Sequence, residues 1–241
     1  MDWKSRKILV TGGAIRVGAE IVRYFYNLGA EIFVHCNSSV DSAKNLQAEL
    51  PKIKYIQVDL NKIAEVRKVA ELIRSENIDT LINNASIYEH YKLQENSKEA
   101  VQKHLQINAY SPKILMEAII DNAQKKVGNY DIINILDQVI LHKELPQGAY
   151  FGSKKMLGDF TLDFAEEYGK FNCKVNSIAP GPMLAPEVIG NNRMEKTIPS
   201  LPLLRKVEII DLCRTIEFLI ENSSITGAVI PLDCGQHLRY K

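Results

Sequence analysis

A phenol and an ammonium group stand four residues apart in the segment Tyr150-Phe151-Gly152-Ser153-Lys154. On a helix, residues four apart share a face, so the two side chains are expected to meet. A neighbouring ammonium charge lowers the pKa of a phenol from its ordinary value of about 10, and a phenol tuned in this way can donate a proton beside a hydride-transfer site. Tyr150 and Lys154 are therefore predicted to be catalytic. The alternative is an ordinary exposed pair on an amphipathic helix.

A carboxylic acid, Asp137, ends an apolar run thirteen residues before Tyr150. Ligands of open parallel sheets bind at the carboxyl ends of the strands. If the run is a strand, Asp137 lies at the edge of the sheet where a proton donor is needed. Alternatively, its carboxylate only caps a turn or a helix.

A glycine-rich segment from Val10 to Gly18 joins the first apolar run to the first helical pattern. Gly12 and Gly13 allow unusual backbone angles and the close approach of a pyrophosphate, and Gly18 allows a helix to pack tightly on a strand. The helix N-terminus offers N–H groups to an anion, and the Arg16 guanidinium can bind phosphate oxygens. Many strand–helix junctions carry two glycines, but this position favours a dinucleotide site.

The second apolar run is followed by Asn37, Ser38 and Ser39, with no acidic residue at the point where NAD-specific sites hold the ribose hydroxyl. These neutral groups can accommodate a 2′-phosphate, which favours NADP(H). Alternatively, Ser38 or Ser39 only caps the next helix. Asp59, after the third run, either binds the adenine edge or caps the helix that follows.

Short runs rich in Ile, Val and Leu alternate with helical patterns along the whole chain. The predicted strands are Lys7–Thr11, Ala30–His35, Ile53–Val58, Thr80–Ile82, Tyr130–Leu136, Lys174–Ile178 and Ala228–Pro231. The predicted helices are Ala19–Leu28, Ser42–Leu50, Ala64–Arg74, Ala109–Lys125, Lys154–Tyr168 and Glu208–Ile220. This alternation predicts an α/β fold, a single domain over residues 1–241 with a doubly wound parallel sheet of about seven strands buried on both faces. Pro180–Leu203 is expected to be a long irregular substrate loop.

The composition is that of an ordinary globular protein, with 46% hydrophobic and 24% charged residues. Thirty basic and 29 acidic residues give a formal net charge of +1, which indicates no general attraction to nucleic acid or to a membrane surface. The four cysteines lack zinc-ligand spacing, so we expect reduced thiols and no metal. No apolar run has the length of a signal-peptide core or a membrane span, so a cytoplasmic protein is expected.

Together these motifs resemble the short-chain dehydrogenase/reductase family over the whole chain. The matching marks are Thr11-Gly12 with Gly18, Asn83-Asn84-Ala85, Asn108, Tyr150 with Lys154, and Pro180-Gly181. The resemblance implies a Rossmann-like fold, hydride transfer from a nicotinamide cofactor, and a homotetramer.

Two departures from the common family pattern point to one branch. Arg16 stands at the usual middle glycine of the turn, and Asp137 at the usual catalytic serine. Both are similar to the pteridine reductase branch, including bacterial dihydromonapterin and dihydrofolate reductases, and so are Asn84-Ala85-Ser86-Ile87-Tyr88 and the segment Pro231–Arg239. A serine polarises a carbonyl, whereas a carboxyl group paired with Tyr150 can relay a proton to the nitrogen of a C=N bond.

The resemblance implies a role for each matching residue. The catalytic set is Asp137, Tyr150, Lys154 and Asn108, in which Asn108 holds a relay water and Lys154 also binds the nicotinamide ribose. The expected cofactor contacts are Gly12, Ile15, Arg16, Val17, Asn37, Ser38, Ser39, Asp59, Leu60, Asn84, Ala85, Ser86, Tyr150, Lys154, Pro180 and Gly181. The expected substrate contacts are Arg16, Ser86, Tyr88, Asp137, Tyr150, Met183 and Leu184.

Several of these roles have plainer alternatives. Tyr88 would stack on a pterin ring, or is only a loop tyrosine. Met183 and Leu184 would wall the substrate site, or only pack a lid. His237 and Arg239 would reach a neighbouring subunit, or form an exposed tail.

The expected activity is the NADPH-dependent reduction of a dihydropterin, namely dihydromonapterin, dihydrobiopterin or dihydrofolate, to its tetrahydro form. One alternative is a short-chain carbonyl reductase such as a 3-oxoacyl reductase, which the absence of the serine disfavours. Another is a catalytically silent dinucleotide-sensing module, which the intact Tyr150 and Lys154 disfavour.

Overall fold

The computed structural model describes residues 2–88, 97–143, 148–184 and 192–240. Seven strands form one sheet in the order β3-β2-β1-β4-β5-β6-β7, and every neighbouring pair is parallel. The strands are β1 Lys7–Thr11, β2 Glu31–Cys36, β3 Lys54–Gln57, β4 Thr80–Asn83, β5 Tyr130–Ile135, β6 Cys173–Pro180 and β7 Val229–Leu232. This confirms the predicted fold class. The strand order reverses between β1 and β4, so the carboxyl ends of these strands border the crevice in which such sheets bind ligands.

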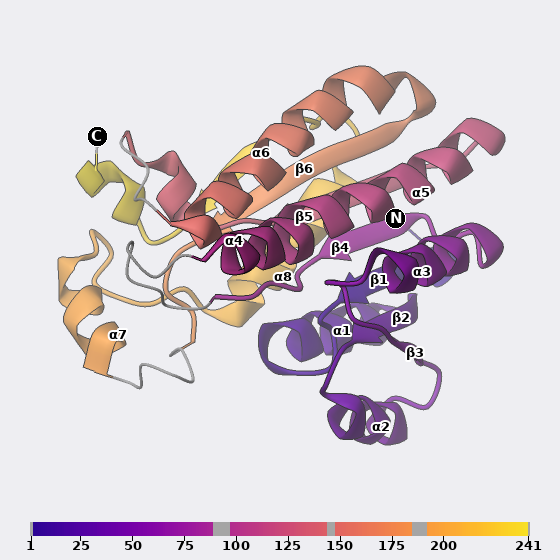
Figure 1. Cartoon of the computed structure of the whole chain (residues 1–241), viewed down its shortest axis with the longest axis horizontal. Helices are drawn as coiled ribbons and strands as arrows, with labels where there is room; N and C mark the ends of the chain where they lie inside the picture. Colours follow the sequence, from indigo (N-terminus) through magenta and orange to yellow (C-terminus); the bar gives the residue numbers. More distant parts are fainter. Residues whose placement is uncertain (1, 89–96, 144–147, 185–191, 241) are drawn as a thin grey trace.

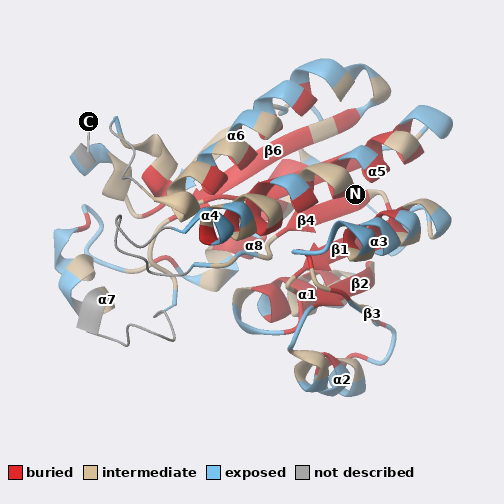
Figure 2. Cartoon of the chain, in the orientation of Figure 1, coloured by how far each residue is buried: buried red, intermediate tan, exposed pale blue. Residues whose placement is uncertain are grey.

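Helices cover both faces of the sheet (Figure 1). They are α1 Arg16–Leu28, α2 Val40–Glu49, α3 Ile63–Ser75, α4 Lys98–Leu105, α5 Ser111–Lys125, α6 Ala149–Tyr168, α7 Asn192–Thr197 and α8 Ile209–Glu221. One buried cluster packs α3, α5 and α6 on the sheet, and a second packs α1, α2 and α8 on the other face. The central strands are accordingly buried, as Figure 2 shows in red.

The two outer strands differ from the prediction of strands buried on both faces. Both end residues of β3, Lys54 and Gln57, are exposed, and β7 is only half-buried. Both strands form an edge of the sheet and have a neighbouring strand on one side only. An apolar run at an edge therefore looks like a central strand in the sequence but is less buried in the fold.

The α4 helix is an element that the apolar pattern did not predict. Its sequence is mostly polar, and it begins at the Ser97 cap, whose Oγ accepts a hydrogen bond from the Ala100 N–H at 3.2 Å. It continues through a π-helical turn, Gln106–Tyr110, into α5. The predicted helix Ala109–Lys125 thus corresponds to α5 and misses α4 and most of the π-helical turn.

The predicted irregular loop Pro180–Leu203 is only partly irregular. β6 extends to Pro180, and the loop contains α7 followed by a 3-10 turn, Ile198–Ser200. Residues 185–191 of this segment lie outside the described residues.

The described residues also bear on the requirements of membrane helices, disulfide bonds and metal sites. None of the helices in the described ranges combines the length and apolarity that crossing a membrane requires. The four cysteines are free, as predicted, with Cys36, Cys173 and Cys213 buried. In the described part of the chain, no three His, Cys, Asp or Glu side chains are grouped so that they could hold a metal ion.

Candidate active site

The first turn of α6 brings Tyr150 and Lys154 together at the carboxyl end of β5. Lys154 is 3% exposed, and its Nζ donates a hydrogen bond to the Ile135 carbonyl at 2.8 Å. The same Nζ lies 5.9 Å from the centre of the Tyr150 ring. The two side chains thus share a face of the helix, as their spacing predicted, and neither is an ordinary exposed surface residue.

Asp137 binds both the backbone and the phenol. Its Oδ1 accepts a hydrogen bond from the Val139 N–H at 3.0 Å and caps the 3-10 turn that follows β5. Its Oδ2 accepts one from the Tyr150 hydroxyl at 2.8 Å. The cap predicted for Asp137 is therefore confirmed, and it fixes the carboxylate in the orientation that meets the phenol, whereas a part in proton transfer stays a prediction.

The environment of Tyr150 contradicts the expected direction of its pKa. Burial raises the pKa of the phenol well above its usual value, and the charge of Asp137 and the hydrogen bond to it raise it further. Burial also lowers the pKa of Lys154 to about 8, against the opposing effect of Asp137. At neutral pH the phenol therefore keeps its proton and is a hydrogen-bond donor to the carboxylate.

The Asn108 side chain, in the π-helical turn, is fully occupied by protein groups. Its Oδ1 accepts from the Ile87 N–H at 2.9 Å and from the Ser86 Oγ at 3.2 Å. Its Nδ2 donates to the Ile87 carbonyl at 3.0 Å and to the Ser153 Oγ at 3.0 Å. An amide group has two donors and two lone pairs, so none is left for a water. A relay water at this residue would have to bind its main-chain carbonyl.

Ser153 is a positioning residue that the sequence prediction missed. It is fully buried, and besides the bond from Asn108 its Oγ donates to the Tyr150 carbonyl at 2.7 Å. It thus ties the first turn of α6 to the π-helical turn. A serine beside a lysine on a helix carries no local signal of this role.

Asn84 connects the end of β4 to the glycine turn. Its Nδ2 donates to the carbonyls of Thr11 and Gly12 at 2.9 and 3.2 Å. The Thr11 Oγ1 in turn accepts from the Asn84 and Ala85 N–H groups, both at 3.0 Å. Asn84 and Ala85 therefore support the backbone of the turn, and their contact with a cofactor stays a prediction.

The glycine turn requires glycine at two of its positions. Gly12 has a φ of +62°, and a Cβ at Gly18 would lie 2.1 Å from the Gly12 carbonyl oxygen. Arg16, the first residue of α1, has a φ of +53°, and the Ile15 cap makes no side-chain hydrogen bond to the N–H groups of the helix. The glycine turn and the N-terminus of α1 fit the phosphates of a dinucleotide.

At the adenosine side of the crevice, Asn37 and Ser38 are exposed after β2. Ser39 precedes α2, but its side chain makes no capping hydrogen bond. The Asp59 Oδ1 accepts from the Asn61 N–H at 2.9 Å and caps a turn before α3 rather than the helix itself. Leu60 is buried in the core, which leaves only its backbone for a ligand.

The predicted substrate residues lie at different depths. The Tyr88 ring meets the Tyr150 ring edge-on, with centres 4.8 Å apart, and is 37% exposed. Met183 packs against the core, whereas Leu184 is exposed. The Gly181 N–H donates to the Leu232 carbonyl at 2.9 Å, so this residue is held against the end of β7. Pro180, the last residue of β6, is buried.

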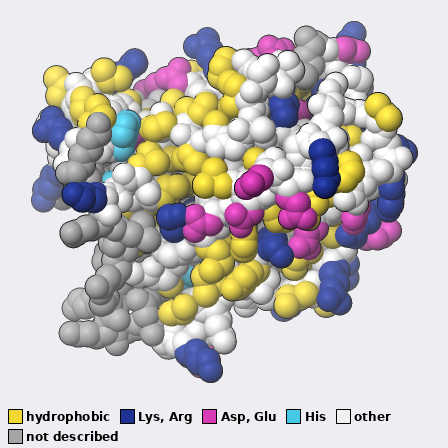
Figure 3. Space-filling view, turned by 90° about the horizontal axis from the view of Figure 1, so that it is seen from above, with side chains coloured by type: hydrophobic (Ala, Val, Ile, Leu, Met, Phe, Trp, Pro, Cys, Tyr) yellow, Lys and Arg dark blue, Asp and Glu magenta, His cyan; other side chains and the backbone are white. Residues whose placement is uncertain are grey.

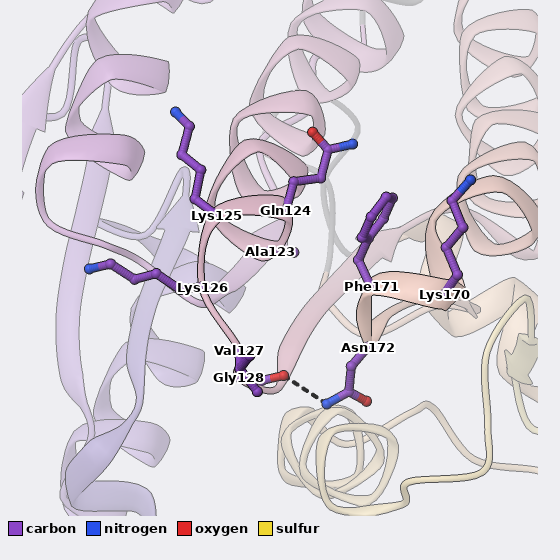
Figure 4. Close-up of a pocket in the computed structure, with 9 residues that line it drawn as sticks. All are labelled: Ala123, Gln124, Lys125, Lys126, Val127, Gly128, Lys170, Phe171 and Asn172. Atoms are coloured by element: carbon purple, nitrogen blue, oxygen red, sulfur yellow. Dashed lines mark hydrogen bonds between the residues drawn. The ribbon is translucent and has the colours of Figure 1, made fainter.

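A separate hollow of about 360 Å³ lies at the opposite edge of the sheet, beside the amino ends of β5 and β6 (Figure 4). It is lined by Ala123, Gln124, Lys125, Lys126, Val127, Gly128, Lys170, Phe171 and Asn172. The three ammonium groups point away from one another, and the Asn172 Nδ2 donates to the Gly128 carbonyl at 2.7 Å (Figure 4). The hollow contains no predicted site residue and is not part of the candidate active site.

Known proteins resemble the chain in sequence and in structure. Residues 6–196 match the short chain dehydrogenase family. Dihydromonapterin reductase of Escherichia coli (strain SMS-3-5 / SECEC) is 28% identical, with 96% of this chain and 97% of that protein covered. 2-Dehydro-3-deoxy-D-gluconate 5-dehydrogenase of Bacillus subtilis (strain 168) is 27% identical, with coverage of 96% and 94%. The structure of FolM alternative dihydrofolate reductase 1 from Brucella canis, complexed with NADP, matches with a TM-score of 0.90 and 30% identity, with 99% of this chain and 96% of that chain covered.

Proposed function

This chain belongs to the short-chain dehydrogenase family, and from that premise we propose that it reduces a dihydropterin to the tetrahydro form with NADPH. The observation that carries the proposal is the hydrogen bond of 2.8 Å from the Tyr150 hydroxyl to the Asp137 carboxylate. A carboxylate at this place suits a substrate whose reduction requires a proton on nitrogen.

The cofactor is NADP(H). The Brucella canis protein is complexed with NADP, and this chain would offer the same class of ligand a tightly packed glycine turn in which Gly12 has a φ of +62° and no side chain fits at Gly18. The exposed Asn37 and Ser38 are neutral and would accommodate a 2′-phosphate, which supports the choice of NADP(H). When bound, NADPH supplies the hydride.

The protein groups then supply and place the proton. Tyr150 is protonated at neutral pH, and its pairing with Asp137 fixes the direction of the hydroxyl. The pair delivers a proton to the ring nitrogen, directly or through a water, as the neighbouring ring carbon receives hydride. The ammonium of Lys154 balances the negative charge of Asp137 and binds the nicotinamide ribose. Replacement of the lost proton through a water on the Asn108 main chain completes the cycle.

The remaining predicted residues would form the substrate walls. Tyr88, which is edge-on to Tyr150 and partly exposed, would stack on one face of a flat ring. Ser86 and Arg16 would contact polar edges of the pterin or the cofactor phosphates. Met183 and Leu184 would close the apolar side.

A carbonyl or sugar-acid substrate is the second candidate, because the Bacillus subtilis dehydrogenase is as similar in sequence as the pterin reductase is. NADPH oxidation by the purified protein separates the two candidates. The assay compares dihydromonapterin, dihydrobiopterin and dihydrofolate with a panel of ketones and oxo-acids. We expect kcat/KM to be highest for a dihydropterin. A higher value for any carbonyl compound would contradict the proposal, and NADPH binding without turnover of any substrate would favour a silent module.

We also propose that the protein is a cytoplasmic homotetramer, as the family resemblance implies. The exposed large hydrophobic side chains include Tyr110, Leu162 and Phe218, which are 42%, 48% and 51% exposed. The face that carries α6 shows such side chains in patches between charged ones (Figure 3). Sedimentation at equilibrium tests the proposal: four chain masses of 27.2 kDa are expected, and a monomer would contradict it.

A further inference from the structure

His35 connects three backbone segments at the border of the dinucleotide site. It lies in β2 and is 2% exposed. Its ring Nδ1 is 3.1 Å from the Gly12 nitrogen, and its Nε2 is 3.1 Å from the Val58 carbonyl oxygen. Its own carbonyl accepts a hydrogen bond from the Gly13 N–H at 3.0 Å. One residue therefore holds both amides of the glycine turn and ties the turn to the end of β3.

These contacts determine the tautomer of the ring. The Gly12 N–H is a donor, so Nδ1 must be the unprotonated acceptor. Nε2 then carries the hydrogen and donates it to the Val58 carbonyl. Burial lowers the pKa of His35 to about 4, against the opposing effects of the bond to Val58 and the charge of Asp59. The neutral ring that the geometry requires is thus also the form that its surroundings favour.

The glycine turn is held from two sides. The Asn84 Nδ2 reaches the Gly12 carbonyl from β4, and the His35 ring reaches the Gly12 N–H from β2. Gly12 needs such support because glycine has more backbone freedom than any other residue. A turn that is ordered before its ligand arrives binds more tightly, since less conformational entropy is lost on binding.

We infer that His35 is a positioning residue for NADP(H): its neutral ring, protonated at Nε2, holds the Gly12–Gly13 backbone in the shape that receives the pyrophosphate and couples it to the Val58–Asp59 segment. The inference rests on the cofactor of the proposed function and not on its substrate. His35 would not touch the cofactor, and it acts through the backbone that does.

Three substitutions separate the two ring contacts. In His35→Asn, the amide oxygen occupies the place of Nδ1 and can still accept from the Gly12 N–H. In His35→Gln, the longer amide can donate to the Val58 carbonyl but leaves the Gly12 N–H without an acceptor, and His35→Leu removes both bonds. We expect the NADPH Kd, measured by fluorescence titration, to stay within about threefold in the Asn variant and to rise about tenfold or more in the Gln and Leu variants.

Asn122→Leu provides the matched control. Asn122 is buried, and its Nδ2 donates to the Ile73 and Ile78 carbonyls at 2.9 and 3.0 Å, on the far side of the sheet from the glycine turn. This variant also loses two buried hydrogen bonds, so its Tm should fall while its NADPH Kd stays unchanged. Every titration is done well below the lowest Tm.

The rank order of the variants decides the inference. It is overturned if the Asn and Gln variants bind NADPH equally well, or if Kd follows Tm through the whole set, Asn122→Leu included. If His35→Leu does not fold, the comparison of Asn with Gln still decides. Failure of the unsubstituted protein to bind NADPH would instead overturn the proposed function.

Discussion

At the scale of single residues, the hydrogen bond between Tyr150 and Asp137 makes the phenol a proton donor. Burial raises the pKa of the phenol, and the carboxylate raises it further and accepts its hydrogen, so the proton stays on oxygen at neutral pH. Tyr150→Phe removes this proton and keeps the ring that packs against Tyr88. We expect kcat to fall about 10²- to 10⁴-fold, with little change in the NADPH Kd. Steady-state assays and fluorescence titration check this, and turnover equal to that of the unsubstituted protein would refute the assignment of Tyr150.

Lys154 gives the site a pH limit at the same scale. Burial lowers the pKa of its ammonium group to about 8, so the charged form is lost as the pH rises through that value. In the proposed mechanism the charged form balances Asp137 and binds the ribose, so kcat/KM should fall above about pH 8. The measurement is kcat/KM for the preferred substrate from pH 6 to pH 10, with enzyme stability checked at each pH. A constant value up to pH 10 would show that the charge of Lys154 is not required.

At the scale of elements, a buried ion cluster joins strands at the amino edge of the sheet, away from the active site. The Lys174 Nζ donates to the carbonyls of Leu219, Ile220 and Asn222 at 2.7–2.9 Å and caps the end of α8. It also lies 3.0 Å from Oδ1 of Asp131, which is 1% exposed. Lys174 thus stabilises a helix end and a buried carboxylate together.

Lys174→Met should therefore lower the free energy of unfolding by about 2–3 kcal/mol. The loss is smaller than for a buried carboxylate that loses its one cationic partner, because the Arg6 guanidinium still lies 2.6 Å from Asp131. Urea denaturation measures the change. The control is Lys155→Met, which removes an exposed ion pair with Asp159 and should cost less than about 1 kcal/mol. Equal effects of the two substitutions would contradict the role of the buried cluster.

The sequence predicted the elements wherever burial and chain order decide them. Apolar runs predicted the central strands, and the placement of Asp137 and Tyr150 after β5 predicted that they would meet. The polar α4 helix was missed, because its capping by Ser97 and its packing do not produce an apolar pattern. The predicted direction of the Tyr150 pKa shift was wrong, because burial of the phenol raises the pKa most and the charge of Asp137 raises it further, and neither can be read from the spacing of Tyr150 and Lys154. The bond from Gly12 to His35 crosses 23 residues and has no local signature.

At the scale of the whole molecule, His35 makes global stability depend on pH. Its pKa is about 4 in the folded protein and 6.5 in the unfolded chain, so the unfolded chain binds more protons between these values. The contribution of neutral His35 to the free energy of unfolding is therefore complete above pH 6.5. It is lost as the pH falls toward 4, and the loss amounts to about 3 kcal/mol. His35→Asn cannot titrate, so the difference in unfolding free energy between the two proteins should shift by this amount between pH 7 and pH 4. Urea denaturation at both pH values checks this, and a constant difference would refute it.

In the proposed function, the carboxylate of Asp137 selects a substrate that is reduced at a C=N bond. The most direct measurement is the ratio of kcat/KM for the best dihydropterin to kcat/KM for a ketone, in the unsubstituted protein and in Asp137→Ser. We expect the serine to lower this ratio about 100-fold or more, mainly through loss of pterin turnover, while NADPH still binds. An unchanged ratio would contradict the proposed role of Asp137.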